Sequence, residues 1–201
     1  MGWVWEADRP LRTQEQIARE VHEVSLERGL DDLATVLALM CIRQESDFWC
    51  PWNAKDPTSK NYPHDSQSDD GRSVGYLQQQ NGIAGENPPG NQNWWGPMAQ
   101  RMDLRGSVNE FLSRLSNDYH AAADDPYRAA QFIQNVQRSY WNGDPGHAGY
   151  YGKHWAYCWS LLRRALEGTP TPVVPITPPS VKPKPGISPN PAWRGDPVWL
   201  P

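Results

Sequence analysis

The apolar residues near the start of the chain recur at the spacing of an amphipathic helix. Thr13 begins a T-x-x-Q capping pattern with Gln16, and Gly29 is of the residue type that most often follows a helix end. Between these signals, the apolar positions three or four residues apart are Ile17, Val21 and Val24. The pattern predicts a first helix over residues 14–28.

A second helix follows, and the rest of the chain is organised around it. Asp31 or Asp32 is its predicted N-cap. One stripe of its helical repeat, apolar except for the last residue, consists of Leu33, Val36, Leu37, Met40, Cys41 and Gln44. Glu45 lies at the margin of this stripe, before Phe48 and Pro51, which predicts a half-buried carboxylate where the helix reaches the surface. Desolvation there would raise the pKa of Glu45, as a general acid at neutral pH requires. A solvated glutamate at a helix end is the simpler alternative.

After this helix the pattern predicts loops and shorter helices. Residues 51–73 form a long polar loop with room for a short hairpin, and residues 74–79 fit either a strand or the start of a helix. Gly75 predicts a close approach of its backbone to another group. The further predicted helices span residues 98–102, residues 107–119 behind a Ser107 cap, residues 126–140 and residues 151–166. The predicted fold class is all-α, with at most a small β-hairpin.

Composition divides the chain near residue 168. Residues 169–191 are rich in proline, threonine and valine, which predicts a stiff, extended linker without a core of its own. Residues 192–201 are too few to fold alone, and they look like the start of a further domain or a docking peptide. Residues 1–168 are therefore expected to form the folded domain.

Charge and hydropathy argue against two classes of function. The net charge of -4 and the pI near 5.7 disfavour a nucleic-acid-binding protein, whose binding face would be basic. Mean hydropathy is -0.77, and no apolar run approaches the roughly 20 residues of a membrane span. The N-terminus lacks the basic and apolar regions of a signal peptide.

Three cysteines cannot all pair, so no disulfide framework is expected, although a Cys41–Cys50 bridge is conceivable.

Eleven tryptophans are a large number for this chain, and several fall in sequence that is typical of loops. These are Trp49, Trp52, Trp94, Trp95 and Trp141. Sugar rings stack their apolar C–H faces on aromatic planes, so tryptophans in loops suit a carbohydrate-binding cleft. Ordinary packing is the alternative for each of them, because an indole buries a large area wherever it lies.

Several blocks of the sequence, taken in order, resemble one group of enzymes. Gln44-Glu45-Ser46, followed by SVGYLQ at residues 73–78, resembles the E-S and G-L-M-Q signature of goose-type lysozymes and soluble lytic transglycosylases. The blocks NYPHDSQSDDGRSVGYLQQQ, WWGPMAQRMD and AAQFIQNVQRS resemble the lysozyme-like domain of actinobacteriophage endolysins and tail proteins. The resemblance covers about residues 14–166 and implies a lysozyme-like fold. It also implies cleavage of the β-1,4 bond between N-acetylmuramic acid and N-acetylglucosamine in bacterial peptidoglycan.

The resemblance assigns the general acid to Glu45 and leaves the second carboxylate open. In the goose-type pattern an aspartate lies six residues before the glycine of the second block; Asp69 holds that position here, with Asp70 beside it. If either aspartate faces the cleft, it could position water for hydrolysis. If neither does, the 6-hydroxyl of the substrate could close the ring, as in lytic transglycosylases. Two solvated loop aspartates are the simpler reading, and a further aspartate of the pattern is replaced by Gln80.

The same resemblance indicates which residues would bind the glycan strand. The expected substrate-binding residues are Ser73, Gly75, Tyr76, Gln78, Trp94 and Trp95. Gln78 would donate a hydrogen bond to a hydroxyl or N-acetyl group, and Gln79 would point outward if the segment were extended. The family's A-Y-N-x-G motif places a tyrosine near the acid. Tyr140 is the nearest match to that tyrosine and Tyr151 is the alternative, with core packing equally open for Tyr140.

Two other kinds of catalytic site are alternatives. A cysteine peptidase would need a thiolate beside a histidine, and an exposed Cys50 with His64 nearby in sequence is the best such pair. A metal site could use Asp144, His147 and His154, although their spacing matches no zinc signature. Surface histidines without a metal are the simpler interpretation.

A non-catalytic glycan-binding or virion structural module would use the tryptophan-rich loops equally well, but it would tolerate glutamine in place of Glu45. A chitinase-type lysozyme would need a second glutamate after Glu45, and the next one is Glu86. We therefore expect a monomeric peptidoglycan-cleaving enzyme that needs no cofactor or metal and is one module of a phage lysin. Such a lysin would pass from the host cytoplasm to the host cell wall; a tail-associated virion enzyme is the alternative.

Overall fold

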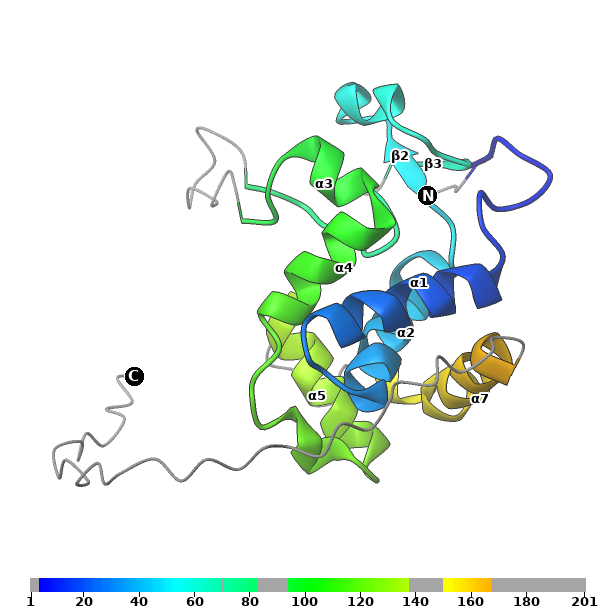
Figure 1. Cartoon of the computed structure of the whole chain (residues 1–201). Helices are drawn as coiled ribbons and strands as arrows, with labels where there is room; N and C mark the ends of the chain where they lie inside the picture. The colour runs from blue at the N-terminus through cyan, green and yellow to red at the C-terminus, as the bar shows by residue number, and fades with distance from the viewer. Residues whose placement is uncertain (1–3, 70, 83–93, 138–149, 168–201) are drawn as a thin grey trace, which may run out of the picture. The chain divides into compact units, whose positions relative to one another are not determined.

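The computed structural model describes residues 4–69, 71–82, 94–137 and 150–167. Within these ranges the chain is mainly helical with one small sheet (Figure 1), which confirms the predicted predominance of helices. The helices are α1 (Gln14–Glu27), α2 (Asp32–Ser46), η1 (Pro57–Asn61), α3 (Met98–Met102), α4 (Leu104–Ser113), η2 (Tyr119–Ala122), α5 (Pro126–Gln137) and α7 (Trp155–Glu167).

Helix α2 is the buried centre of the fold. The sequence predicted one apolar stripe, but all of residues 33–42 are buried, because α1, α4, α5 and α7 pack around the helix. A helix that is apolar on every face is stable only in such a surrounding. The polar residues 43–45 in its last turns are partly exposed. Glu45 is therefore half-buried at the end of a core helix, as predicted.

The ends of the first two helices follow the predicted signals. Thr13 and Gln16 form a reciprocal capping box at the start of α1. Gly29 follows the end of α1 with a φ of +70°, a conformation that glycine adopts at little cost. Asp31, rather than Asp32, caps α2 and accepts a hydrogen bond from the Ala34 amide at 3.1 Å.

Helix α4 begins earlier than the sequence predicted. Its N-cap is Asp103, which has an extended backbone and accepts a hydrogen bond from the Gly106 amide at 2.7 Å. Ser107, the predicted cap, lies inside the helix and donates its hydroxyl to the Leu104 carbonyl at 3.1 Å. The chain offers two capping side chains in succession, and only Asp103 has the extended backbone that an N-cap needs.

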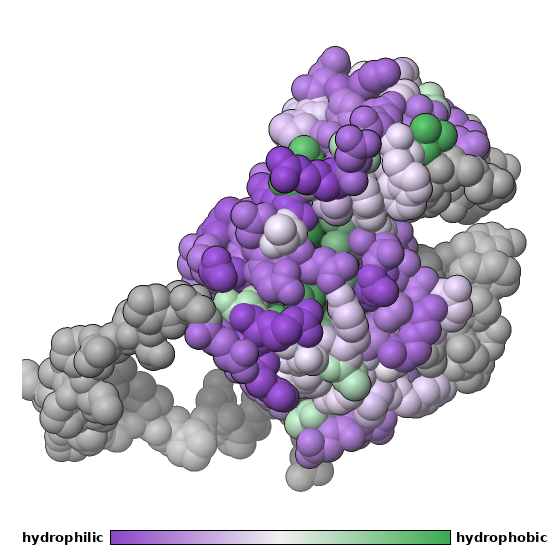
Figure 2. Space-filling model, turned by 90° about the vertical axis from the view of Figure 1, so that its right-hand side faces the viewer, coloured by the Kyte–Doolittle hydropathy of each residue, from purple (hydrophilic) through white to green (hydrophobic). Residues whose placement is uncertain are grey.

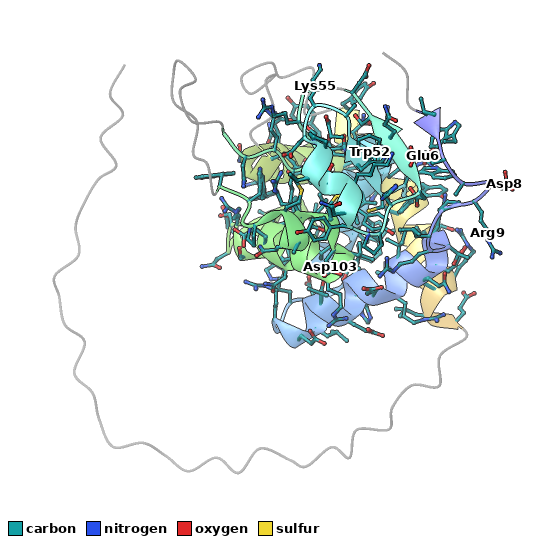
Figure 3. All side chains as sticks on the ribbon, turned by 90° about the horizontal axis from the view of Figure 1, so that it is seen from above. Glu6, Asp8, Arg9, Trp52, Lys55 and Asp103 are labelled. Carbon is teal, nitrogen blue, oxygen red and sulfur yellow. The ribbon has the colours of Figure 1, made fainter. Side chains whose placement is uncertain are left out.

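The sheet has three short strands in the order β1 (Val4–Trp5), β3 (Ser66–Ser68) and β2 (Pro51–Asn53). The predicted hairpin is wrong: β2 and β3 are parallel, and the chain between them crosses over through η1 instead of turning tightly. The antiparallel partner of β3 is β1. In the turn after β1, Asp8 and Arg9 project away from the ribbon (Figure 3).

Residues 74–79 form a tight turn, called the Gly75 turn below, that is neither strand nor helix. Its first and last residues pair across an isolated antiparallel bridge, and Gly75 and Gln78 have φ values of +68° and +47°. A Cβ atom on Gly75 would lie 2.2 Å from the backbone oxygen of Arg101. The predicted close approach of the Gly75 backbone to another group is confirmed.

No helix in the described ranges is both long and apolar enough to cross a membrane. These ranges all belong to a compact unit, Met1–Thr169. The predicted linker, residues 169–191, and the terminal residues 192–201 lie outside the described residues.

Candidate active site

The last turn of α2 carries Gln44, Glu45 and Ser46, and each is held by a different part of the chain. Ser46 donates its hydroxyl to the Tyr76 carbonyl at 2.7 Å, which joins α2 to the Gly75 turn. Gln44 Oε1 lies 3.0 Å from His154 Nε2, just before α7 begins. Because an amide oxygen can only accept, His154 Nε2 carries the hydrogen in this contact.

Glu45 accepts a hydrogen bond from the hydroxyl of Tyr151, which lies in the helical residues 150–152. The Tyr151 side chain is buried, and burial, followed by the nearby charge of Glu45, raises the pKa of its phenol. The phenol therefore stays protonated and acts as a fixed donor to the carboxylate. Tyr140, the other tyrosine that the sequence offered for this position, lies outside the described residues.

One helical turn before Glu45, a single amide joins three elements. Gln137 Nε2, on α5, lies 2.9 Å from Cys41 Sγ and 2.9 Å from the Leu77 carbonyl oxygen. Burial, and then the charge of Glu45, raise the pKa of the Cys41 thiol, which stays neutral. Gln137 was missed in the sequence. The signal was a polar residue four positions after the buried Ile133, on the apolar face of its helix.

His154, which contacts Gln44 on α2, is a neutral group at pH 7. Burial, and then the positive charges of Lys153 and Arg43, lower the pKa of its imidazole to about 4. In the alternative metal site, His154 would act with Asp144 and His147, which lie outside the described residues. The hydrogen-bond partner of His154 is Gln44. Among the residues that are described, no group of three histidines, cysteines or acids could hold a metal ion.

Of the two aspartates predicted as the second carboxylate, the structure describes Asp69 but not Asp70. Asp69 is exposed directly after β3, and Asp70, like Glu86, lies outside the described residues. Gln80, which replaces the family's further aspartate, turns its side-chain oxygen back toward the Arg72 amide at 3.2 Å. The identity of a second carboxylate stays a prediction.

The predicted glycan-binding residues of the Gly75 turn differ in their exposure. Ser73 and Gln78 are half-buried, and Gln78 Nε2 donates to the Gly75 carbonyl at 2.9 Å. Tyr76 is buried, and its hydroxyl accepts from Arg12 Nη1 at 3.2 Å. It therefore holds the turn to the core and is not free to contact a glycan. Gln79, which would point outward from an extended segment, is buried because the segment is a turn.

The tryptophans expected to line a cleft also fall into two groups. Trp52 and Trp95 are buried, so ordinary packing explains both. Trp94 is half-buried, with the Arg114 guanidinium 4.2 Å from the centre of its ring. Trp49 is half-buried, and Trp141 lies outside the described residues.

The cysteine-peptidase alternative is contradicted by the surroundings of Cys50. Its side chain, expected to be exposed, is fully buried, and its Sγ contacts the Pro63 carbonyl oxygen at 3.5 Å. Burial and the nearby charge of Asp65 raise the pKa of this thiol, which opposes a nucleophilic thiolate. His64 pairs with Glu6 at 3.1 Å instead. All three cysteines are free, so the conceivable Cys41–Cys50 bridge is not formed.

A half-buried carboxylate that a buried phenol holds in place can deliver or accept a proton at a defined position. Comparison with models of known protein families, and with curated proteins, finds no match to this chain. Its function is therefore inferred from the chemistry around Glu45 and from the sequence blocks that surround this residue.

Proposed function

We propose that this chain cleaves the glycan strand of bacterial peptidoglycan, with Glu45 as the general acid. The bond cleaved would be the β-1,4 bond between N-acetylmuramic acid and N-acetylglucosamine, as in the goose-type family that its sequence blocks resemble. The observation that carries the proposal is the hydrogen bond from the buried Tyr151 hydroxyl to the half-buried Glu45. A lysozyme-like fold is part of the same proposal.

The contact with Tyr151 determines which oxygen of Glu45 can hold the transferable proton. Tyr151 donates to Oε1, so a protonated Glu45 carries its own hydrogen on Oε2 while Oε1 continues to accept. The hydrogen bond also fixes the plane of the carboxyl group. A positioned acid of this kind typically contributes a factor of about 100 to 10,000 to the rate.

Three titratable side chains around the end of α2 are uncharged at pH 7. The Cys41 thiol and the Tyr151 phenol both have raised pKa values and stay neutral, and the lowered pKa of His154 keeps its imidazole neutral at pH 7. None of these three side chains places a positive charge beside the carboxylate.

After the glycosidic oxygen is protonated, two routes complete the reaction. In a hydrolase, Asp69 or Asp70 would position a water molecule that attacks the anomeric carbon. In a lytic transglycosylase, the 6-hydroxyl of the muramic acid would attack instead and leave a 1,6-anhydro ring. Both routes need the same proton from Glu45, and they differ in the new chain end.

The proposal extends to the biological setting. The chain would be one module of a phage lysin that reaches the host cell wall from the host cytoplasm, or of a tail-associated virion enzyme. Its partners would be peptidoglycan glycan strands, and it would act as a monomer.

The test is the release of soluble fragments from purified actinobacterial peptidoglycan by the wild type and by Glu45→Gln. We expect at least about a 100-fold loss of release in Glu45→Gln, with binding to the insoluble wall retained. Glu20→Gln is the matched control, because Glu20 is also half-buried and hydrogen-bonded, to Arg12 at 3.0 Å. Wild-type binding without release would instead indicate a glycan-binding module. Undiminished release by Glu45→Gln would mean that another residue is the acid.

A further inference from the structure

Exposed apolar side chains concentrate in the segment that leads from β1 into α1. Val4, Trp5 and Leu11 are 51%, 53% and 45% exposed. The ring of Trp5 meets the ring of Trp49, with 4.3 Å between their centroids and 45° between their planes. These two indoles, called the Trp5–Trp49 platform below, have no role in the chemistry proposed for Glu45.

Trp49 is held at the end of the helix that carries the acid. The residues before it, Asp47 and Phe48, both have positive φ values, of 50° and 67°, and Phe48 is fully buried. Such a backbone is costly for residues with side chains, and it persists only where the surrounding structure holds it. The Trp49 amide then donates to the Ser46 carbonyl at 3.0 Å. Trp49 therefore has a fixed position relative to α2.

Trp5 is held to the same part of the fold. The next residue, Glu6, donates its amide to the Asp65 carbonyl at 3.1 Å. The buried carboxylate of Asp65 accepts from the amides of Leu11 and Cys50, each at 2.8 Å. One carboxylate thus joins the segment after Trp5 to the residue after Trp49. The positions of both indoles are therefore fixed by the fold around them.

The size of the platform indicates what kind of ligand it would take. A half-exposed indole offers on the order of 130 Å² of surface, whereas a stable protein interface buries about 800 Å² on each partner. The face seen in Figure 2 is mostly hydrophilic, with small separate hydrophobic patches. A single sugar ring matches one indole in area, and it stacks its C–H face on an uncharged aromatic plane.

The platform is close to the proposed cleavage site along the chain. Trp49 follows Glu45 by four residues, which limits the separation of their Cα atoms to about 15 Å. A glycan strand with one bond at Glu45 extends over several sugar units on either side of that bond. The neighbouring units are therefore within reach of the platform.

We propose that the Trp5–Trp49 platform binds an N-acetylhexosamine unit of the glycan strand away from the bond that is cleaved. This inference rests on the proposed function, because a glycan strand is the substrate named there. Its role is to hold the strand, so it contributes to affinity for long substrates and not to the proton transfer.

The test is calorimetric titration of the full chain, carrying Glu45→Gln to prevent cleavage, with the N-acetylglucosamine oligomer chitohexaose. We expect Trp5→Ala to weaken binding about tenfold and Trp5→Tyr, which keeps an aromatic face, to restore most of it. Tyr127→Ala is the matched control, because Tyr127 is 44% exposed at the start of α5, and it should bind as tightly as the parent. Equal affinities for Trp5→Ala and its parent, or no binding by the parent, would overturn the proposal.

Two further readouts separate this inference from the proposed function. In the chain with Glu45 intact, Trp5→Ala should raise KM on long glycan strands and leave kcat unchanged. If the chain binds chitohexaose through Trp5 but cleaves no peptidoglycan, the binding role of the platform is supported and the proposed cleavage is refuted. If Trp5→Ala lowers the melting temperature but not the affinity, the indole covers Trp49 as a packing contact and the platform is refuted.

Discussion

The contact between Tyr151 and Glu45 joins residues 106 positions apart in the sequence, and the assignment of the acid depends on it. Glu45 alone would be a glutamate at a helix end, a common and mostly structural position. A buried tyrosine hydroxyl needs a hydrogen-bond partner. Here that partner is the carboxylate of Glu45, so the two side chains hold each other in place. At the residue scale, the chemistry therefore depends on how Tyr151 and its neighbours are held.

Tyr151→Phe should lower the rate of glycan cleavage about 10- to 100-fold, because it removes one charge-assisted hydrogen bond that positions the acid. The ring stays in its buried site, so the melting temperature should change little. Initial release rates and thermal denaturation of the purified variant measure both effects. A full rate in Tyr151→Phe would show that Glu45 does not depend on this donor.

His154 should make stability depend on pH below neutrality. Its pKa is about 4 in the folded chain, against an ordinary value near 6.5, so the folded state binds this proton less readily than the unfolded state does. The stabilisation is complete above pH 6.5 and is lost as the pH falls toward 4. Because His154 is only partly buried, we expect a loss of about 1–2 kcal/mol.

Denaturant unfolding at pH 7 and pH 4.5 measures this loss. In His154→Gln the difference between the two pH values should shrink. An unchanged pH dependence in His154→Gln would assign the acid sensitivity to other groups.

At the scale of elements, local signals in the sequence predicted more than long-range ones. The capping box of α1, the Asp31 cap and the apolar run of α2 each lie within a few residues, and both helices were placed within one or two residues. The half-buried position of Glu45 followed from its place on α2. The sheet did not follow, because β1 meets β3 across some 60 residues and no local pattern records that pairing.

The site was predictable to the same degree. The half-burial of Glu45 and the close approach at Gly75 were predicted from local patterns, whereas the choice between Tyr140 and Tyr151 depends on a contact between distant elements. Gln137 was missed for the same reason, since its partners Cys41 and Leu77 are far away in the sequence. The burial of Tyr76 and Trp95 also depends on tertiary packing that single residues do not reveal.

Gly75→Ala should destabilise the chain by about 3 kcal/mol or more, because the new Cβ would meet the Arg101 backbone oxygen at 2.2 Å and the φ of +68° adds strain. Gly29→Ala is the matched control. It has a similar φ of +70° but nothing within 4 Å of its Cβ, so it should cost only about 1 kcal/mol. The free energy of unfolding of Gly29→Ala measures the backbone strain alone, and the extra loss in Gly75→Ala measures the steric clash with Arg101. Equal losses would show that the Gly75 turn can move away from Arg101.

At the scale of the whole molecule, residues 1–168 are predicted to carry both the fold and the reaction. Glu45 and its partner Tyr151 both lie before residue 168, and residues 169–191 have the composition of a stiff linker without a core of its own. A chain that ends at residue 168 should therefore keep the melting temperature of the full chain and its rate of fragment release. Thermal denaturation and release assays on the two chains test this. A large fall in either quantity would assign a structural or binding role to residues 169–201.

The most direct test of Glu45 as the acid is mass spectrometry of the chain ends that form when purified peptidoglycan is digested. We expect the wild type to produce new N-acetylmuramic acid ends, either reducing ends or 1,6-anhydro ends that are lighter by one water. The first product would identify a hydrolase and the second a lytic transglycosylase. Glu45→Gln should produce neither. New peptide termini on intact glycan strands, or the same new glycan ends from Glu45→Gln, would contradict the proposed reaction.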